Sequence, residues 1–547
     1  MRIGPSPLSS EPVAPASRLG RVAVAVAVVV AMAVGCTRGR EEPAAAPSDP
    51  ALVQTATGVV RGLVGQDHRF FAGIPYAAPP VGPLRWKPAE PALKWDGVRE
   101  AGRLGPRCIQ DLGGDLELGR QTDEDCLTLN VWTPMATPDS APAAPRPVMV
   151  WIHGGSFVNG SGGIYDAQRL AVRGDIIVVT INYRLGVLGF LAHPALGSAG
   201  DVGNYGLGDQ QAALRWVRDN IAQFGGDPAK VTVAGESAGG MSVCDHLVAP
   251  GSQGLFDAAI IQSAPCQAQA TLPVAQARSV DYAAEVGCAD PESAAACLRA
   301  LPVGKLRKPL WFYNIGEDKL IGPVTGTTTL PVDPVKGFAE GRAARVPVMI
   351  GTTRDEFTLF VALEYLHGGK SYSASDYPDL LAATFGDDSA AVAEQYPLTD
   401  FDSVPLAYSA AVTDGVFACV GDRMADALAR DDDDAVYSYE FNDRGAPTPD
   451  PLRTLPFAVG ASHSLELRYL FDVGGAPPFD AAQQKLSDQM IDYWSQFVTN
   501  GTPRAAGQPD WPDVGAADPV MSLQPDGSRM IADFEQAHHC EFWAALQ

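Results

Sequence analysis

The stretch Val231–Gly239 has the sequence VTVAGESAG, and it decides the fold. Its first four residues suit a buried β-strand, and the next five fit the pattern G-x-S-x-G around Ser237. A helix-compatible run, Gly240–Leu247, follows directly. Because glycine has no Cβ, the glycines on either side of the serine let strand and helix approach closely. The order strand, sharp turn, helix predicts a nucleophile elbow, with the Ser237 hydroxyl at a helix N-terminus that stabilises negative charge.

Other apolar runs predict further strands of the same sheet. Each is short and continuous, as expected for strands that are covered on both faces. These runs are Val148–Ile152, Ile176–Ile181, Ala258–Gln262 and Val346–Ile350. Between them, Gly208–Phe224 has apolar residues at helical spacing. The alternation predicts an α/β fold with a large, mostly parallel central sheet and helices on both faces. The stretch 270–345 has weak periodicity and is predicted to be a helical insertion.

A glycine-containing loop follows the predicted strand Val148–Ile152. It is His153–Phe157, with the sequence HGGSF. Loops of this kind donate backbone N–H groups to the oxyanion of a tetrahedral intermediate. Small residues are needed there because a bulky side chain would obstruct the acyl carbon. We expect the oxyanion donors to be the N–H groups of Gly155, Ser156 and Ala238, the last of which directly follows Ser237.

A serine hydroxyl is a weak nucleophile and needs a general base. In folds with a nucleophile elbow the chain order is serine, acid, histidine. Histidines downstream of the helix behind Ser237 are His367, His463, His538 and His539. Of these, His463 lies in a loop-like stretch that precedes an apolar run.

The acid is expected after a strand between the serine and the histidine. Asp355 and Glu356 both follow the predicted strand Val346–Ile350. The residues alone do not choose between these two carboxylates.

Several segments together resemble the type-B carboxylesterase family, the relatives of cholinesterases. The match runs from about residue 52 to Trp543. Its motifs are Phe224–Gly239, which fits the family's active-site signature, Glu124–Trp132, which fits its second signature, and the shorter segments Asn182–Arg184, Tyr493–Phe497 and Trp511–Pro512. The resemblance implies an α/β-hydrolase fold and a serine carboxylic ester hydrolase that works through an acyl-enzyme.

The resemblance also implies residue roles. The second carboxylate, Glu356, would be the catalytic acid and His463 the base, so that Ser237, Glu356 and His463 form the triad. Disulfides Cys108–Cys126 and Cys288–Cys297 are implied as well. Phe357 stands where glycine is common in the family, which is expected to alter the pocket wall. No cofactor or metal is expected, because the triad chemistry needs none.

Charge and cysteine content limit the partners and the compartment. The 547 residues carry 40 Lys or Arg against 64 Asp or Glu, a net charge of −24. So acidic a surface repels nucleic acid and anionic membranes, and the partner expected is a small ester. If Cys36 is lipidated, eight of the nine cysteines remain for oxidative pairing. Besides the two local pairs, we expect Cys244–Cys266 and Cys419–Cys540, although spacing alone does not fix connectivity.

The N-terminus is predicted to be a targeting segment and not part of the fold. Arginines precede the uncharged apolar run Val22–Gly35, which is too short to span a bilayer but suits a signal-peptide core. The run ends in Ala33–Cys36 (AVGC), which resembles the lipobox of bacterial lipoproteins. We therefore expect a lipoprotein-type signal peptide (1–35) with lipidation at Cys36, or an ordinary secretory signal cut nearby. A flexible tether (36–50) and one hydrolase domain (51–547) follow, in a protein exported to the cell surface or secreted.

Substrate preference is only weakly encoded. The loop between Cys108 and Cys126 has no aromatic residue, whereas in cholinesterases it supplies the tryptophan that stacks on choline. Leu359 and Phe360 suggest an apolar pocket wall or plain core packing. We expect short- to medium-chain or aromatic esters. The alternatives are a lipase or sterol esterase and a non-catalytic cell-surface binding or adhesion protein of the same fold.

Overall fold

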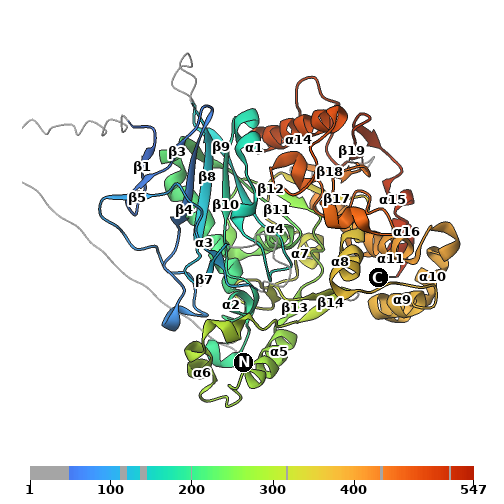
Figure 1. Ribbon diagram of the computed structural model, residues 1–547, viewed down its shortest axis with the longest axis horizontal. Helices are drawn as coiled ribbons and strands as arrows, with labels where there is room; N and C mark the ends of the chain where they lie inside the picture. Colours follow the sequence, from blue (N-terminus) through green and yellow to red (C-terminus); the bar gives the residue numbers. More distant parts are fainter. Residues whose placement is uncertain are drawn as a thin grey trace, which may run out of the picture. The chain divides into compact units, whose positions relative to one another are not determined.

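A large mixed β-sheet forms the centre of the protein (Figure 1). The computed structural model describes residues 49–110, 120–135, 144–198, 200–315, 318–430, 435–515 and 519–546. The predicted signal peptide, Cys36 and nearly all of the predicted tether lie outside the described residues. Residues 49–547 make up one compact unit.

The central sheet has eleven strands. In spatial order they are β20 (Arg529–Ile531), β19 (Val520–Leu523), β18 (Val436–Phe441), β17 (Val348–Thr353), β12 (Ala258–Gln262), β11 (Gly226–Glu236), β9 (Arg146–Ile152), β10 (Ile177–Ile181), β8 (Thr128–Pro134), β4 (His68–Pro75) and β3 (Leu63–Val64). The strands from β19 to β10 pair in parallel, and the pairings at both edges of the sheet are antiparallel. This confirms the prediction of an α/β-hydrolase fold with a mostly parallel sheet.

Helices cover both faces of the sheet. The α-helices are α1 (Gln168–Gly174), α2 (Gly186–Phe190), α3 (Tyr205–Asn220), α4 (Ala238–Val248), α5 (Leu272–Glu285), α6 (Ala294–Ala300), α7 (Pro334–Ala339), α8 (Thr358–Gly368), α9 (Tyr377–Phe385), α10 (Ser389–Gln395), α11 (Val404–Val412), α12 (Cys419–Leu428), α13 (Leu467–Leu470), α14 (Ala481–Asn500), α15 (Phe534–Ala537) and α16 (Cys540–Ala545). Buried side chains of α3, α4, α7 and α12 form one core with the sheet. Those of α1, α13 and α14 form a second core on the other face.

Strand alternation explains why both faces carry a core. Along β9, Val148, Val150 and Ile152 belong to the first core, and Met149 and Trp151 belong to the second. Successive side chains of a strand point to opposite faces, so a strand buried on both faces must be apolar throughout. The continuous apolar runs in the sequence are the consequence.

The predicted helix Gly208–Phe224 differs in its bounds from the helix in the structure. The helix α3 is Tyr205–Asn220, and Ile221–Phe224 is a short 3₁₀ turn. Gly225 ends this turn with φ 94°, a left-handed conformation that glycine adopts without strain.

The insertion 270–345 is only partly helical. It contains α5, α6 and α7, as predicted, but also four short strands that periodicity did not indicate. These pair as β13 (Ala270–Thr271) with β16 (Val324–Thr325), and β14 (Tyr313–Ile315) with β15 (Asp318–Leu320). Strands of two or three residues are too short for an alternating pattern to be detected.

Three further short strands lie near the start of the described chain. They are β1 (Leu52–Gln54), β2 (Val59–Arg61) and β5 (Val98–Glu100), which form a separate three-stranded sheet. The strands β6 (Arg107–Cys108) and β7 (Thr122–Asp123) form a two-stranded ladder.

Four disulfides join the eight cysteines of the described residues. The bonds are Cys108–Cys126, Cys244–Cys266, Cys288–Cys297 and Cys419–Cys540. The structure thus pairs the cysteines as expected. The Cys419–Cys540 bond closes a separation of 121 residues and ties α16 to α12.

Within the described part of the chain, one helical run is long and apolar enough to cross a membrane by length and composition. It is Val404–Leu428, whose most apolar window of 18 residues is 72% buried inside the protein. Such burial is typical of a core helix in a globular domain.

Candidate active site

Ser237 occupies a strained turn between β11 and α4. Its backbone has φ 56° and ψ −124°, a region that a non-glycine residue rarely adopts. Its N–H donates to the carbonyl of Gln262 at 3.0 Å, which anchors the turn to β12. Strain of this kind costs about 1–3 kcal/mol and concentrates at functional sites. The geometry is that of a nucleophile elbow.

The two glycines of the motif are required by close backbone contacts. A Cβ on Gly235 would lie 2.4 Å from the carbonyl carbon of Gly239. A Cβ on Gly239 would lie 2.0 Å from the carbonyl oxygen of Ile152, at the end of β9. Real Cβ atoms do not approach backbone this closely, so any side chain here would push α4 off the sheet.

The loop after β9 lies against the elbow. A Cβ on Gly154 would be 3.0 Å from the Cβ of Ser237. Gly155 has φ 106° and begins a turn in which its carbonyl accepts from the N–H of Asn159 at 3.1 Å. Ser156 follows with φ 52°. Among the described residues, no backbone carbonyl accepts from the N–H groups of Gly155, Ser156 or Ala238.

His153 supports this loop from within the core. Its ring stacks on Tyr183 at a centroid distance of 4.5 Å, and its Nδ1 is 2.8 Å from the carbonyl oxygen of Gly154. Burial lowers the pKa of His153 to about 4, against a smaller opposing effect of that carbonyl. The imidazole is therefore neutral at physiological pH, and its contacts with Tyr183 and Gly154 support the loop.

The structure brings His463 and Glu356 into direct contact. The His463 Nδ1 lies 2.6 Å from the Glu356 Oε2. The other carboxylate oxygen of Glu356 accepts from the Thr352 hydroxyl and the Thr353 N–H, both at 2.7 Å. Burial alone would raise the pKa of Glu356, but the imidazole of His463 outweighs burial and lowers it. Glu356 is therefore an ionised, fully buried carboxylate.

The neighbouring carboxylate, Asp355, points elsewhere. It binds the guanidinium of Arg444 at 2.7 and 2.9 Å and accepts from the N–H of Ala461 at 2.9 Å. Consecutive residues thus have separate tasks. Asp355 fixes the loop that carries His463, whereas Glu356 contacts the His463 ring.

The other ring nitrogen of His463 faces the elbow. The His463 Nε2 is 3.1 Å from the Oε1 of Glu236, the residue that precedes Ser237. The hydroxyl of Ser464 donates to the same oxygen. The imidazole therefore connects Glu356 to the turn that carries Ser237.

A third carboxylate, Glu466, lies in the same buried region. One oxygen accepts from the Gln262 amide at 3.2 Å, and Gln262 in turn accepts from the indole of Trp494 at 2.9 Å. Burial, followed by the charges of Glu236 and Glu356, raises the pKa of Glu466 well above its usual range. Burial and its anionic neighbours thus favour the neutral, protonated form of Glu466.

The carboxylates decide the charge of the imidazole. Burial by itself would lower the pKa of His463, but Glu236 and Glu356 outweigh burial and raise it to about 9. Burial also raises the pKa of Glu236, and the His463 charge opposes that rise. The sequence analysis missed Glu236 and Glu466. The available signals were a carboxylate inside G-x-S-x-G and another three residues after His463.

Aromatic rings from two helical segments lie beside His463. The rings of Phe360 on α8 and of Phe417 lie 5.1 and 5.7 Å from the imidazole centroid, and the two rings stack on each other at 6.3 Å. Phe357 is buried and stacks behind Phe360 at 5.0 Å. The predicted apolar wall therefore includes Phe360, while Phe357 belongs to the core behind that wall.

The other downstream histidines lie away from Ser237. His538 is buried between Asp414 and Glu440, at 2.5 and 2.8 Å. His539 bonds the Gln395 amide at 3.0 Å. His367 lies in the last turn of α8. Within the described ranges no cluster of His, Cys, Asp or Glu is arranged to hold a metal ion.

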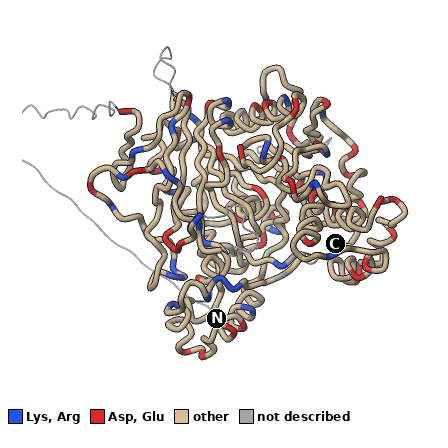
Figure 2. The backbone as a smooth tube through the Cα atoms, in the orientation of Figure 1, with Lys and Arg blue, Asp and Glu red and all other residues tan. Residues whose placement is uncertain are grey.

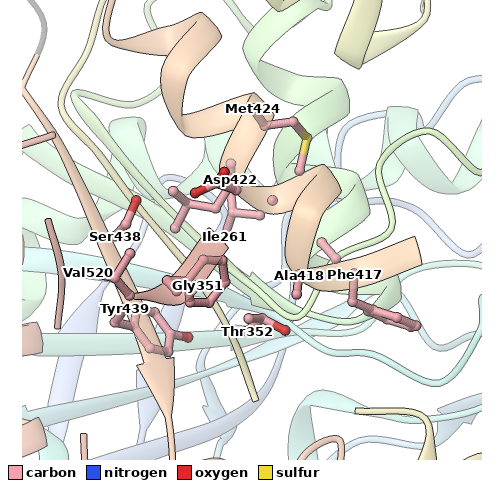
Figure 3. A pocket seen from close by; sticks show the side chains of 14 residues that line it. Ile261, Gly351, Thr352, Phe417, Ala418, Asp422, Met424, Ser438, Tyr439 and Val520 are labelled. Carbon is pink, nitrogen blue, oxygen red and sulfur yellow. The ribbon is translucent and has the colours of Figure 1, made fainter. Parts of the chain in front are cut away.

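A small cavity lies behind the Glu356 loop (Figure 3). It has a volume of about 20 Å³ and is lined by Thr352, Phe417 and Tyr439, among others. A Cβ on Gly351 would lie 2.3 Å from the Tyr439 ring, so this wall is tightly packed. The cavity has room for about one water molecule, not for an ester.

Comparison with known proteins shows the family of this chain. A profile described as the carboxylesterase family matches residues 49–543. The chain belongs to the carboxylesterase family. Fumonisin B1 esterase from Sphingopyxis macrogoltabida is 34% identical over 545 residues, which cover 94% of each chain. Para-nitrobenzyl esterase from Bacillus subtilis is 36% identical over 482 residues, covering 84% of this chain and 92% of that protein.

Solved structures agree as well. A PNB esterase superposes with a TM-score of 0.76 at 32% identity, covering 90% of this chain and 99% of that one. The carboxylesterase family and these similar esterases show that the chain is an ester-hydrolysing enzyme.

The contact between Glu236 and His463 predicts a shift in pH dependence. In Glu236→Gln the imidazolium loses one anionic neighbour, so the pKa of His463 falls. If the rising limb of kcat/KM against pH reports deprotonation of His463, its midpoint moves to lower pH in this variant. The measurement is a pH profile of ester turnover, with the exposed Glu535→Gln as control. An unchanged midpoint would show that Glu236 does not set the charge of His463.

Proposed function

We propose that this carboxylesterase hydrolyses its substrates through an acyl-enzyme on Ser237, with His463 as general base and Glu356 as the orienting acid. One observation carries the proposal. The His463 ring has one nitrogen 2.6 Å from Glu356, and its other nitrogen contacts the residue directly before Ser237. A base held by a buried carboxylate beside the turn that carries a strained serine supports a catalytic triad.

Acylation follows from these positions. The neutral form of His463 is the minor form at neutral pH, because its pKa is about 9. In that form the Glu356 carboxylate accepts from Nδ1–H, and Nε2 is left as the proton acceptor. His463 takes the Ser237 proton as the serine oxygen forms a bond to the ester carbonyl carbon. The carbonyl π electrons move onto its oxygen. When this tetrahedral intermediate collapses, the C–O bond to the alcohol breaks and His463 gives the proton to the leaving alcohol.

Deacylation repeats the cycle with water. His463 removes a proton from water, which attacks the acyl-enzyme carbonyl. Collapse releases the carboxylic acid and returns the proton to Ser237. Glu356 stabilises the imidazolium formed in each half-reaction and is not itself protonated.

The oxyanion of each intermediate is proposed to bind the N–H groups of Gly155, Ser156 and Ala238. Support comes from the turn of the loop after β9 and from its close approach to the elbow. Ala238 is the first residue of α4, so the helix dipole adds to the effect. A single oxyanion donor is typically worth about 3–4 kcal/mol in the transition state.

The proposed substrates are short- to medium-chain or aromatic esters. Phe360 and Phe417 beside His463 would give such groups an apolar, aromatic surface. The names of the relatives, para-nitrobenzyl esterase and fumonisin B1 esterase, agree with ester chemistry in general. The contacts of His463 with Glu356 and with Glu236, the residue before Ser237, argue against a non-catalytic adhesion protein, which would not need them. No observation favours a lipase or sterol esterase.

We also propose that the protein is exported and anchored through a lipid on Cys36. The AVGC sequence at residues 33–36 motivates the anchor. The four disulfides are typical of proteins that fold in an oxidising compartment.

The nucleophile can be tested by active-site labelling. A fluorophosphonate probe is expected to label the protein once, at Ser237. Ser237→Ala is expected to abolish labelling and to lower p-nitrophenyl ester kcat on the order of 10⁴-fold or more. Peptide mass spectrometry locates the label. Full turnover in Ser237→Ala would disprove the assignment.

The role of Glu356 as the catalytic acid can be tested by comparison with Asp355, the adjacent carboxylate. Glu356→Gln is expected to lower kcat about 10⁴-fold, because the amide cannot hold the correct tautomer or stabilise the imidazolium. Asp355→Asn, one residue away, is expected to keep kcat within about tenfold, because Asp355 only fixes the loop. Equal losses in both variants would contradict a separate role for Glu356.

The pocket wall can be tested with esters of rising acyl length. Phe360→Ala removes a ring beside His463, so kcat/KM for longer acyl chains is expected to rise about tenfold relative to acetate. Phe542→Ala, a half-buried phenylalanine on α16, is the control. If the chain-length profile does not change in Phe360→Ala, that ring does not contact the acyl group.

A further inference from the structure

Exposed apolar side chains are concentrated near the start of the described chain. Of the ten large aliphatic side chains that stay exposed among the described residues, six fall within residues 63–104. They include Leu93, which is 76% exposed, and Leu63, which is 54% exposed. Single exposed aliphatic residues are normal, but such a concentration marks an interaction surface.

Several of these residues belong to neighbouring segments. Leu63 and Val64 form β3, the edge strand of the central sheet. A Cβ on Gly102 would lie 3.0 Å from Leu63, so the segment that precedes Leu104 packs beside β3. Val98 lies on β5, which pairs with β2. Next to this pairing, the Arg61 carbonyl accepts from the N–H of Ala101 at 2.7 Å, so β5 is held close to the chain that leads into β3.

A tryptophan and an arginine belong to the same region. The indole of Trp95 donates to the carbonyl of Val59 at 2.9 Å, which ties the ring to β2. The guanidinium of Arg99 lies over that ring, 5.5 Å from its centroid. We call the exposed and half-buried residues of these neighbouring segments the N-terminal face and define it by Leu63, Leu93, Trp95, Val98 and Leu104. Val64, the next residue of β3, points to the opposite side of the strand from Leu63.

The charge of this face differs from that of the whole protein. Among residues 61–104, six Lys or Arg reach the surface, Arg85 being buried, against four Asp or Glu. The whole chain has 40 basic against 64 acidic residues. In Figure 2 the backbone of this edge, where Figure 1 places β1, β3 and β5, carries Lys and Arg positions interspersed with Asp and Glu positions. The rest of the molecule carries the excess negative charge, so an anionic surface would be approached with the N-terminal face first.

The chain before Asp49 limits where the proposed anchor can be. Asp49 binds Arg61 at 2.8 Å, and the Ala51 carbonyl accepts from the N–H of Gly62 at 2.9 Å, next to Leu63. The segment from Cys36 to Asp49 can span at most about 45 Å. A domain of this size is about 60 Å across. A lipid on Cys36 would therefore keep the side of the domain that carries Asp49 near the bilayer.

We propose that the N-terminal face lies against the surface of the lipid bilayer in which Cys36 is anchored. This rests on the proposed lipid anchor. Exposed aliphatic side chains would enter the headgroup boundary, where a tryptophan beside an arginine is also favourable. Lys and Arg would contact lipid phosphates. The contact would fix the orientation of the enzyme relative to the membrane, which a tether alone would leave free.

Site-specific photocrosslinking in membranes tests the proposal on the full chain. The photoreactive substitutions are Leu93→p-benzoylphenylalanine and Val98→p-benzoylphenylalanine. Val274→p-benzoylphenylalanine and Val280→p-benzoylphenylalanine on α5 are the controls, because these valines are 46% and 44% exposed. We expect lipid adducts at positions 93 and 98 in yields about tenfold above the controls. Ester turnover shows that each variant is folded.

The possible outcomes distinguish a failure of the proposed membrane contact from a failure of the proposed lipid anchor. Lipid at Cys36 is read by mass spectrometry of the N-terminal peptide. If Cys36 carries lipid but positions 93 and 98 crosslink to protein, to a second copy, or no better than the controls, the N-terminal face does not contact the bilayer. If Cys36 carries no lipid, the anchor and this inference are both wrong, while the proposed ester chemistry of Ser237 is unaffected.

Discussion

The site depends on the close approach of helix α4 to strand β9. The backbone of Gly239 lies so near the Ile152 carbonyl that no Cβ fits between them. This contact holds Ser237 in its strained turn and holds the loop after β9 beside it. Both surround the space where an ester carbonyl would be attacked. Strain at Ser237 is tolerated because the buried sheet on which the turn sits carries large apolar cores on both faces.

The second feature on which the site depends is the negative charge around His463. Three buried carboxylates, Glu236, Glu356 and Glu466, lie around one imidazole. Ionised together they would repel one another, and the raised pKa of Glu466 favours its neutral form, which lessens that repulsion. Glu356 remains ionised because it contacts the ring and accepts two further hydrogen bonds. In the proposed mechanism the imidazolium is thus stabilised by charges that are in place before the substrate binds.

The charge of the protein is not distributed evenly over its surface. A net charge of −24 suits a soluble, exported protein, and it does not describe every face. Residues 61–104 combine exposed aliphatic side chains with an excess of basic residues at the surface. Net charge predicts solubility and repulsion from anionic partners, but the position of each side chain decides which face approaches a membrane.

The sequence by itself determined the fold class, the elbow and the strands around it, because buried strands and tight glycine turns depend on local pattern. Val231–Gly239 and Ala258–Gln262 are of this kind. Tertiary structure alone decided which of two adjacent carboxylates meets His463, since Asp355 and Glu356 differ only in what the fold brings beside them. It also decided the contact of Glu236 with the imidazole and the short strands of the insertion. The two carboxylate contacts of His463 join residues more than a hundred positions apart, which no local pattern encodes. The insertion strands of two or three residues are too short for a periodicity to show.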